Sequence, residues 1–248
     1  MSGVLVVIPA RYESTRLPGK ALADLGGQPL VVRVAEVAAR METADAVVVA
    51  TDDARIVAAV EAAGQRAEMT GEHPTGSDRV AEVLARHHAE IVLNLQGDEP
   101  LLEPADLDAL VRALRDDPEA DMATLAHPFD SSDEWRDPNV VKVLVGADGH
   151  ALWFSRSPVP GAHAGAAQDE APWRLARRHV GVYAFRAAAL KRFLNLPRTE
   201  LERVEGLEQL RALEYGLRIL VAPATGLPVG VDTPEDLARV REIWARRG

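Results

Sequence analysis

The sequence predicts an α/β fold built on an open, mostly parallel sheet. Short apolar runs rich in β-branched residues, such as Val4–Ile8 and Ala46–Ala50, alternate with longer helical patterns such as Pro29–Met41. This alternation is typical of parallel strands that carry helices on both faces. The length of 248 residues and the hydrophobic content of 47% are enough for one large domain with a sizeable core.

The first half of the chain follows this rhythm throughout. Strands are expected at Val4–Ile8, Ala46–Ala50, Ile91–Leu95 and Met122–Ala126, and helices at Pro29–Met41, Asp53–Ala63, Arg79–His88 and Pro104–Arg115. The later elements are a strand at His179–Phe185, helices near Arg186–Leu194 and Leu207–Tyr215, a strand at Ile219–Ala222 and a closing helix at Pro234–Arg247.

The pattern changes after Pro128. The runs Val140–Val145 and His150–Phe154 flank the sequence Gly-Ala-Asp-Gly and predict a β-hairpin. The segment Pro158–Pro172 is rich in Pro, Gly and Ala and is expected to be a mobile loop. We therefore predict a single domain, residues 1–248, with an inserted region at about residues 129–185.

Charge and composition exclude several classes of protein. The net charge of −10 argues against general nucleic-acid binding, so an anionic substrate must be captured by a local cationic pocket. The sequence has no cysteine and hence neither disulfides nor thiolate chemistry. It shows neither a signal peptide nor an apolar run of membrane-spanning length, which predicts a cytoplasmic protein without membrane partners.

The loop after the first expected strand is rich in cations. It reads Pro-Ala-Arg-Tyr-Glu-Ser-Thr-Arg-Leu-Pro-Gly-Lys and carries Arg11, Ser14, Arg16 and Lys20. Ligands of open α/β sheets bind outside the carboxyl ends of the strands. Three cations placed there suit a polyphosphate, because they repel one another unless an anion joins them. The loop matches neither common glycine-rich phosphate motif, so side chains would hold the phosphates.

Two further segments carry carboxylates that are candidate site residues. Gln96-Gly97-Asp98-Glu99-Pro100 follows a strand, and Asp98 there suits Mg²⁺, which is usually bound by one or two carboxylates plus substrate phosphates. A polar turn capped by Asp98 is the alternative. In the run beginning at Gly230, Thr233 and Asp236 form a capping box that starts a helix. Asp232 is left over by that box, and from the residues alone it is as well explained by a structural role as by a functional one.

Four other segments carry polar residues that are candidate site residues. His73-Pro74-Thr75-Gly76-Ser77-Asp78-Arg79 opens a helix, and Arg79 is either a charge beside the ligand or an ordinary helix-face arginine. Arg156, which ends the hairpin, can clamp a carboxylate. His179 begins a strand, and Glu208 and Gln209 open a helix. Arg156, His179, Glu208 and Gln209, taken singly, are more often structural.

These motifs, taken in order, resemble the sugar cytidylyltransferases, and most closely the 3-deoxy-manno-octulosonate cytidylyltransferase family. The resemblance lies in A-R-x-x-S-T-R-L-P-G-K, Q-G-D-E-P, F-S-R, R-H-x-G-x-Y, L-E-Q-L-R and G-V-D-T-P-E-D, and it spans Pro9 to Asp236. The order Thr75-Gly76-Ser77 departs from the family's S-G-T but keeps a hydroxyl at each place. The resemblance implies a Rossmann-like sheet of the nucleotide-diphospho-sugar transferase type.

It also implies an activity and residue roles. CMP would pass from CTP to the anomeric hydroxyl of 3-deoxy-D-manno-octulosonate (Kdo), giving CMP-Kdo and pyrophosphate for lipopolysaccharide synthesis. Asp98 and Asp232 would hold Mg²⁺, and Lys20 and Arg16 would act with them in catalysis. Arg11, Ser14, Arg16, Lys20 and Arg79 would bind the nucleotide. The sugar acid would contact Gln96, Arg156, His179, Glu208 and Gln209. The family's homodimeric habit implies a homodimer.

Three alternatives stay open at this stage. A glycosyltransferase on a related fold usually presents D-x-D at its metal strand, whereas this chain has Asp98-Glu99. A non-catalytic nucleotide-binding protein would not need both metal carboxylates. A cytidylyltransferase for acylneuraminate or amino-Kdo would need only small changes in the sugar pocket.

Overall fold

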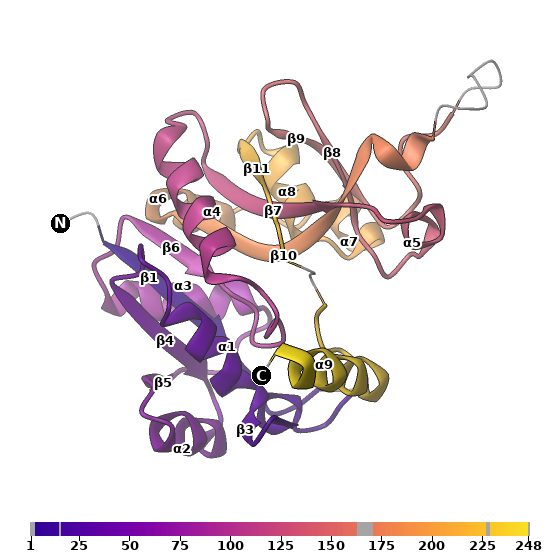
Figure 1. The fold of residues 1–248 in the computed structure, drawn as a ribbon. Coiled ribbons are helices and arrows are strands. Elements are labelled where there is room, and N and C mark those ends of the chain that lie inside the picture. Colours follow the sequence, from indigo (N-terminus) through magenta and orange to yellow (C-terminus); the bar gives the residue numbers. More distant parts are fainter. Residues whose placement is uncertain (1–2, 15, 163–170, 227–228, 248) are drawn as a thin grey trace.

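The computed structural model describes residues 3–14, 16–162, 171–226 and 229–247. Most of the expected loop Pro158–Pro172 lies outside the described residues, because 163–170 are not among them. Within the described part, nine strands form one sheet in the order β11-β7-β10-β6-β1-β4-β5, with β8 and β9 attached beside β10. Figure 1 shows this sheet running through the molecule, with β5 at one end and β11 at the other.

The pairs that involve β10, and the pair of β8 with β9, are antiparallel, and the other strand pairs of the sheet are parallel. The bounds are β1 Val4–Pro9, β4 Ala46–Thr51, β5 Ala67–Met69, β6 Ile91–Asn94, β7 Met122–Pro128, β8 Lys142–Val145, β9 Ala151–Ser155, β10 Ala176–Arg186 and β11 Ile219–Pro223. β1 pairs in parallel with β4 and β6, β4 with β5, and β7 with β11. β10 runs antiparallel to β6, β7 and β8. A separate two-residue ladder joins β2 (Asp24–Leu25) to β3 (Gln28–Pro29).

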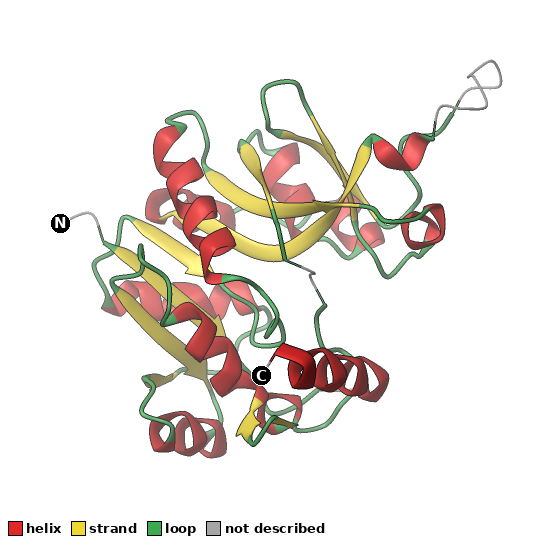
Figure 2. Ribbon diagram, viewed as in Figure 1, coloured by secondary structure: helices red, strands yellow, loops and turns green. Residues whose placement is uncertain are grey.

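Helices cover both faces of the sheet (Figure 2). Their bounds are α1 Leu30–Ala38, α2 Ala54–Ala62, α3 Gly76–Arg86, α4 Pro104–Asp116, α5 Ser132–Arg136, α6 Ala187–Leu194, α7 Glu200–Glu205, α8 Glu208–Glu214 and α9 Pro234–Arg247, with 3-10 turns η1 Lys20–Leu22 and η2 Pro172–Arg174. No helix among the described residues is both long and apolar enough to cross a membrane.

Strand β1 shows why the sheet is sandwiched. Val4, Val6 and Ile8 belong to the cluster that contains buried residues of α1 and α4. Leu5 and Val7 point the other way, into the cluster formed with α3, α6 and α8. Successive side chains of a strand alternate between faces, and a strand covered on both faces therefore reads as an uninterrupted apolar run. The predicted fold class is confirmed.

The expected hairpin forms, and it joins the main sheet through β10. β8 and β9 pair antiparallel, and β8 also pairs with Ala176–Arg178 at the start of β10. Farther along, β10 pairs with β6 and β7 as part of the main sheet. The same 11-residue strand thus ties the hairpin to the strands that lead to the site.

Several short elements were not predicted. They include α5, α7 and β5, together with β2, β3, η1 and η2, and each has six residues or fewer. Helix α3 also starts three residues earlier than expected, because the Thr75 side chain accepts the backbone N–H of Asp78 and caps it. Such short segments carry too little periodicity to be recognised from an apolar pattern.

Candidate active site

The cationic loop starts where β1 ends and returns to the sheet edge at Lys20. Gly19 adopts a φ of 70°, and its N–H donates to the carbonyl of Tyr12. This left-handed conformation favours glycine, because in any other residue the Cβ would lie too close to the residue's own backbone. It leads directly into η1, whose first residue is Lys20.

Lys20 joins the two carboxylates that the sequence proposed as a pair. Its Nζ lies 2.6 Å from Oδ2 of Asp98 and 3.1 Å from Oδ1 of Asp232. Nη2 of Arg16 lies 3.1 Å from Oδ2 of Asp232 on the more exposed side. Three segments that are far apart in the chain therefore meet at one point.

Backbone contacts hold Asp232 in this position. The N–H of Val231 donates to the carbonyl of Asp98 at 2.9 Å. The N–H of Thr233 donates to Asp236 at 2.9 Å, and the N–H of Asp236 donates back to Thr233 Oγ1 at 3.1 Å, which forms the predicted capping box. Gly230 has no room for a side chain, because a Cβ would lie 2.9 Å from Oε1 of Glu99.

The site combines crowded negative charge with burial. Burial by itself lowers the pKa of Lys20, but the charges of Asp98 and Asp232 and their hydrogen bonds outweigh it and raise that pKa above its ordinary value. Burial, reinforced by the neighbouring charge of Asp98, raises the pKa of Glu99 to about 8. Oε2 of Glu99 is buried and has no hydrogen-bond partner among the described residues. Lys20 is thus held charged between two carboxylates, while Glu99 behind them is held neutral.

Two adjoining cavities open at this sheet edge. The first, of about 200 Å³, is lined by Arg11, Ser14, Arg16, Lys20, Asp98 and Asp232, together with Pro9, Ala10, Ala21, Gln96 and Gly97. The second, of about 270 Å³, shares Pro9, Ala10, Arg11 and Gln96 with it and is completed by His73, Pro74, Thr75, Gly76, Arg79 and Glu208. One continuous crevice thus has a strongly charged half and a less charged half.

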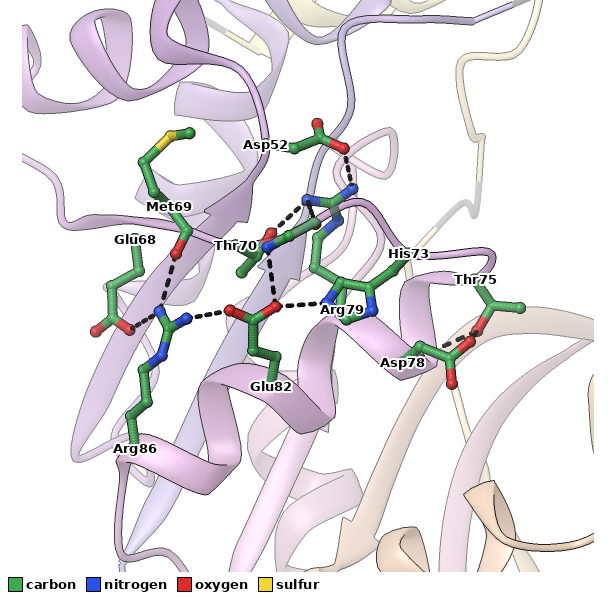
Figure 3. Close-up of polar contacts among 11 residues, drawn as sticks. Asp52, Glu68, Met69, Thr70, His73, Thr75, Asp78, Arg79, Glu82 and Arg86 are labelled. Atoms are coloured by element: carbon green, nitrogen blue, oxygen red, sulfur yellow. Dashed lines mark hydrogen bonds and ion pairs between the residues drawn. The ribbon is translucent and has the colours of Figure 1, made fainter.

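Arg79 is part of the wall of the second cavity. It is only 4% exposed, and its Nη2 donates to Oδ2 of Asp52 at 2.6 Å. Its Nη1 donates to Thr70 Oγ1 (Figure 3). Because these partners occupy the guanidinium, Arg79 holds the loop after β5 in place as well as bordering the cavity.

Of the residues expected to bind the sugar acid, some line the cavities and others do not. Gln96 lies at the boundary of the two cavities, and Glu208 lines the second, where it accepts a hydrogen bond from Ser77 Oγ at 3.1 Å. Burial raises the pKa of Glu208. Gln209 is 6% exposed and lines neither cavity.

Arg156 and His179 also lie outside the linings of both cavities. Nε of Arg156 donates to the carbonyl of Glu205 at 2.7 Å, and its backbone N–H donates to the Glu205 carboxylate at 2.8 Å. A ring nitrogen of His179 lies 3.0 Å from Thr124 Oγ1, and burial lowers the pKa of His179 to about 3. Their contact with a sugar acid stays a prediction.

Sequence analysis missed the contribution of His73, Pro74 and Thr75 to the second cavity. These residues follow β5, a three-residue strand that was not predicted, and precede the helix cap at Thr75. The cap is visible in the sequence, but the direction of the chain before it depends on how β5 pairs with β4.

The family model of the cytidylyltransferases matches residues 5–219. The 3-deoxy-manno-octulosonate cytidylyltransferase of Anaeromyxobacter sp. (strain Fw109-5) is 51% identical over 247 residues, which cover 99% of this chain and 98% of that protein. This chain belongs to the 3-deoxy-manno-octulosonate cytidylyltransferase family. The resemblance stated from the motifs is confirmed.

Other members of the family and solved structures agree. The 3-deoxy-manno-octulosonate cytidylyltransferase of Geobacter sulfurreducens is 48% identical over 96% of this chain and 98% of its own. The solved structure of a CMP:2-keto-3-deoxy-manno-octonic acid synthetase complexed with CTP superposes with a TM-score of 0.93 at 42% identity, over the whole of both chains. A 4-diphosphocytidyl-2C-methyl-D-erythritol synthase from Anaerococcus prevotii, 14% identical with a TM-score of 0.65 over 99% of both chains, shares the fold alone.

Proposed function

We propose that this protein transfers CMP from CTP to the anomeric hydroxyl of Kdo and releases pyrophosphate. The observation that carries the proposal is the meeting of Lys20, Asp98 and Asp232 at the carboxyl edge of the sheet. It is supported by the family's name and by the solved relative that is complexed with CTP.

The triphosphate would lie in the charged half of the crevice. Arg11, Arg16 and Lys20 line it and would neutralise the phosphates and the departing pyrophosphate. The nucleoside would extend into the second cavity, which adjoins the first because Arg11 and Gln96 line both. In the reaction the hydroxyl oxygen of the sugar forms a bond to the α-phosphorus. The bond from that phosphorus to the bridging oxygen breaks, and the hydroxyl proton is released. Catalysis is then mainly positioning and charge neutralisation.

The two carboxylates fit a magnesium ion. Their oxygens converge within 2.6 and 3.1 Å of one ammonium nitrogen, so this point already accommodates a cation. No cluster of three or more His, Cys, Asp or Glu side chains among the described residues could hold a metal alone. This suits Mg²⁺, which completes its coordination with substrate phosphates and water. When bound, Mg²⁺ would supply charge neutralisation at the α-phosphate and lower the pKa of the sugar hydroxyl. Asp98 and Asp232 would hold it, and Lys20 would turn to the phosphates.

The sugar acid would enter beside Gln96 and Glu208. Arg156, His179 and Gln209 would contribute from the hairpin, β10 and α8, as the family's motifs imply. We further propose that the product serves lipopolysaccharide synthesis, that the enzyme works in the cytoplasm, and that it is a homodimer built partly from residues 129–185.

Pyrophosphate release tests the proposal directly. The purified protein is assayed with each of the four ribonucleoside triphosphates, with Kdo or N-acetylneuraminate as acceptor and Mg²⁺ present. Release that requires both CTP and Kdo supports the proposal. Release with neuraminate instead of Kdo would assign a different sugar acid, and binding of CTP with no release in any combination would indicate a nucleotide-binding protein.

A further inference from the structure

A hydrogen-bonded pair, His73 and Glu82, stands at the wall of the second cavity. His73 lines that cavity, and its Nε2 lies 2.5 Å from Oε2 of Glu82 on helix α3. The same Oε2 accepts the backbone N–H of Gly71 at 2.9 Å (Figure 3). Glu82 thus fixes both the backbone of the loop and the imidazole that this loop carries toward the crevice.

The partners of Glu82 determine which ring nitrogen of His73 carries a proton. Oε1 of Glu82 accepts from Arg86, which can only donate, and Oε2 accepts from the N–H of Gly71, which also can only donate. The hydrogen bond from His73, together with that from Gly71, lowers the pKa of Glu82, so the carboxylate is ionised and acceptor-only. Nε2 of His73 must therefore be the donor, and in a neutral imidazole Nδ1 is left as an acceptor.

Nδ1 is free to meet a ligand. No described residue forms a hydrogen bond with it. Residues Arg79, Glu82 and Arg86 follow one another on one face of α3 and hold residues 69–73 from behind (Figure 3). The acceptor is therefore presented by an anchored loop rather than by a free one.

We infer that His73, oriented by Glu82, accepts a hydrogen bond from the 4-amino group of the cytosine ring and so selects CTP over UTP. This inference rests on the proposed function, which places the nucleoside in the second cavity. Cytosine presents an amino donor at C4, whereas uracil presents a carbonyl acceptor there. A fixed acceptor favours the first and repels the second. His73 is then a specificity-determining residue and Glu82 a positioning residue.

The chain offers a matched control at the end of the same helix. His87, just after α3, pairs through Nε2 with Oε1 of Glu68 at 2.8 Å. This pair has the same chemistry as His73 and Glu82, but His87 lines neither cavity. Replacing His87 removes an imidazole–carboxylate pair without touching the crevice.

The experiment measures binding by calorimetry, with Mg²⁺ present and without sugar acid. The probes are CTP, UTP and the triphosphate of 2-pyrimidinone riboside, which lacks only the 4-amino group. For the wild type we expect CTP to bind roughly two- to twelvefold more tightly than the pyrimidinone analogue, because one neutral hydrogen bond contributes about that factor to the affinity. His73→Ala should abolish that difference, whereas His87→Ala should keep it.

Two further variants separate recognition from loop support. His73→Gln can still donate to Glu82 but lacks an acceptor fixed at the Nδ1 position, so it should lose the discrimination while keeping the melting temperature. Glu82→Gln can keep its oxygen toward Gly71 and His73. Its NH2 group then faces Arg86, which can only donate but is exposed and can move away into solvent, so this variant should preserve the discrimination. Glu82→Ala should reduce it.

The inference is overturned if His73→Ala weakens CTP and the pyrimidinone analogue equally, or if the wild type binds both equally. Either result would leave the proposed function standing if the wild type releases pyrophosphate with CTP and Kdo. Loss of the discrimination in His73→Ala, with no transfer to Kdo by the wild type, would instead support the inference and overturn the proposed reaction.

Discussion

The ammonium nitrogen of Lys20 lies 2.6 Å from Oδ2 of Asp98, although 78 residues separate them in the chain. The same nitrogen lies 3.1 Å from Asp232, which is 212 residues away from it. Charge-assisted contacts of this kind hold the two carboxylates close together around one ammonium group. The ammonium group of Lys20 thus lies between the two carboxylates. We expect the phosphates of a substrate to draw this group away from them.

The first prediction concerns the two carboxylates. Asp98→Asn and Asp232→Asn should each fold normally and lose at least about two orders of magnitude in kcat, because each removes charge needed in the transition state. The double variant should be little worse than either single one, since groups that act as a unit are not additive. Steady-state pyrophosphate release at saturating Mg²⁺ measures all three variants. Near-wild-type activity of either single variant would exclude that residue from the metal site.

The second prediction separates the residue proposed to bind the nucleotide, Lys20, from the residue proposed to bind the sugar acid, Arg156. Lys20→Ala should raise the KM for CTP and lower kcat while leaving the KM for Kdo almost unchanged. Arg156→Ala should raise the KM for Kdo by about ten- to a hundredfold, the value of a lost charged hydrogen bond, and leave the KM for CTP almost unchanged.

Both Michaelis constants are measured for both variants, with Lys191→Ala, on the exposed face of α6, as the control. Melting temperatures are compared as well, because Arg156 also contacts the carbonyls of Glu205 and Pro138. If Arg156→Ala mainly raised the KM for CTP, the assignment of Arg156 to the sugar acid would be wrong.

The third prediction concerns the pH dependence of stability. The pKa of Glu99 is raised from 4.5 to about 8 by burial, so the folded state holds this proton at pH values where the unfolded state has released it. The contribution of Glu99 to the free energy of unfolding should therefore fall as the pH rises from about 4.5 to about 8 and change no further above that range, and it is measured as the difference between the wild type and a Glu99 variant.

Glu99→Gln should remove this slope, because the amide stays neutral at all pH values. Urea denaturation at pH 5.5, 7 and 8.5, with a chelator present, compares the wild type with this variant. Glu61→Gln, which alters an exposed side chain of α2, is the control and should keep the wild-type slope. Identical slopes for the wild type and Glu99→Gln would contradict a neutral Glu99.

The fourth prediction is the homodimer. Leu152 on β9 and Leu175 after η2 are 63% and 71% exposed, and both belong to the inserted region at residues 129–185. Burial of such side chains between two copies would remove apolar surface from water. Sedimentation velocity at micromolar concentration should show a dimer, and the variant with Leu152→Glu and Leu175→Glu should be monomeric. Val204→Glu is the control, because it introduces the same charged residue at an 82% exposed apolar site outside that region; this variant should remain dimeric. A monomeric wild type would contradict the prediction.

The sequence by itself determined the fold class and the residues of the charged half of the crevice. Apolar runs such as Val4–Ile8 are local signals, because a strand buried on both faces needs apolar side chains at every position. The capping box of Thr233 and Asp236 is equally local, since its partners are three residues apart. The cations of the loop after β1 and the carboxylate of Asp98 are likewise readable, because their positions after strands place them at one sheet edge. Asp232 was indicated only by the resemblance to the family, since a position before a helix cap does not by itself assign it to that edge.

Only the tertiary structure decided how these groups meet and which others join them. The contact of Lys20 with both aspartates depends on the pairing of β1 with β6 and on the hydrogen bond from Val231 to Asp98. The raised pKa of Glu99 depends on burial. Its carboxylate lies 2.9 Å from where a Cβ of Gly230, 131 positions later in the chain, would be. His73 reaches the crevice because Glu82 and Arg79 hold its loop from helix α3. These are contacts between segments brought together by folding, and no spacing within one segment encodes them.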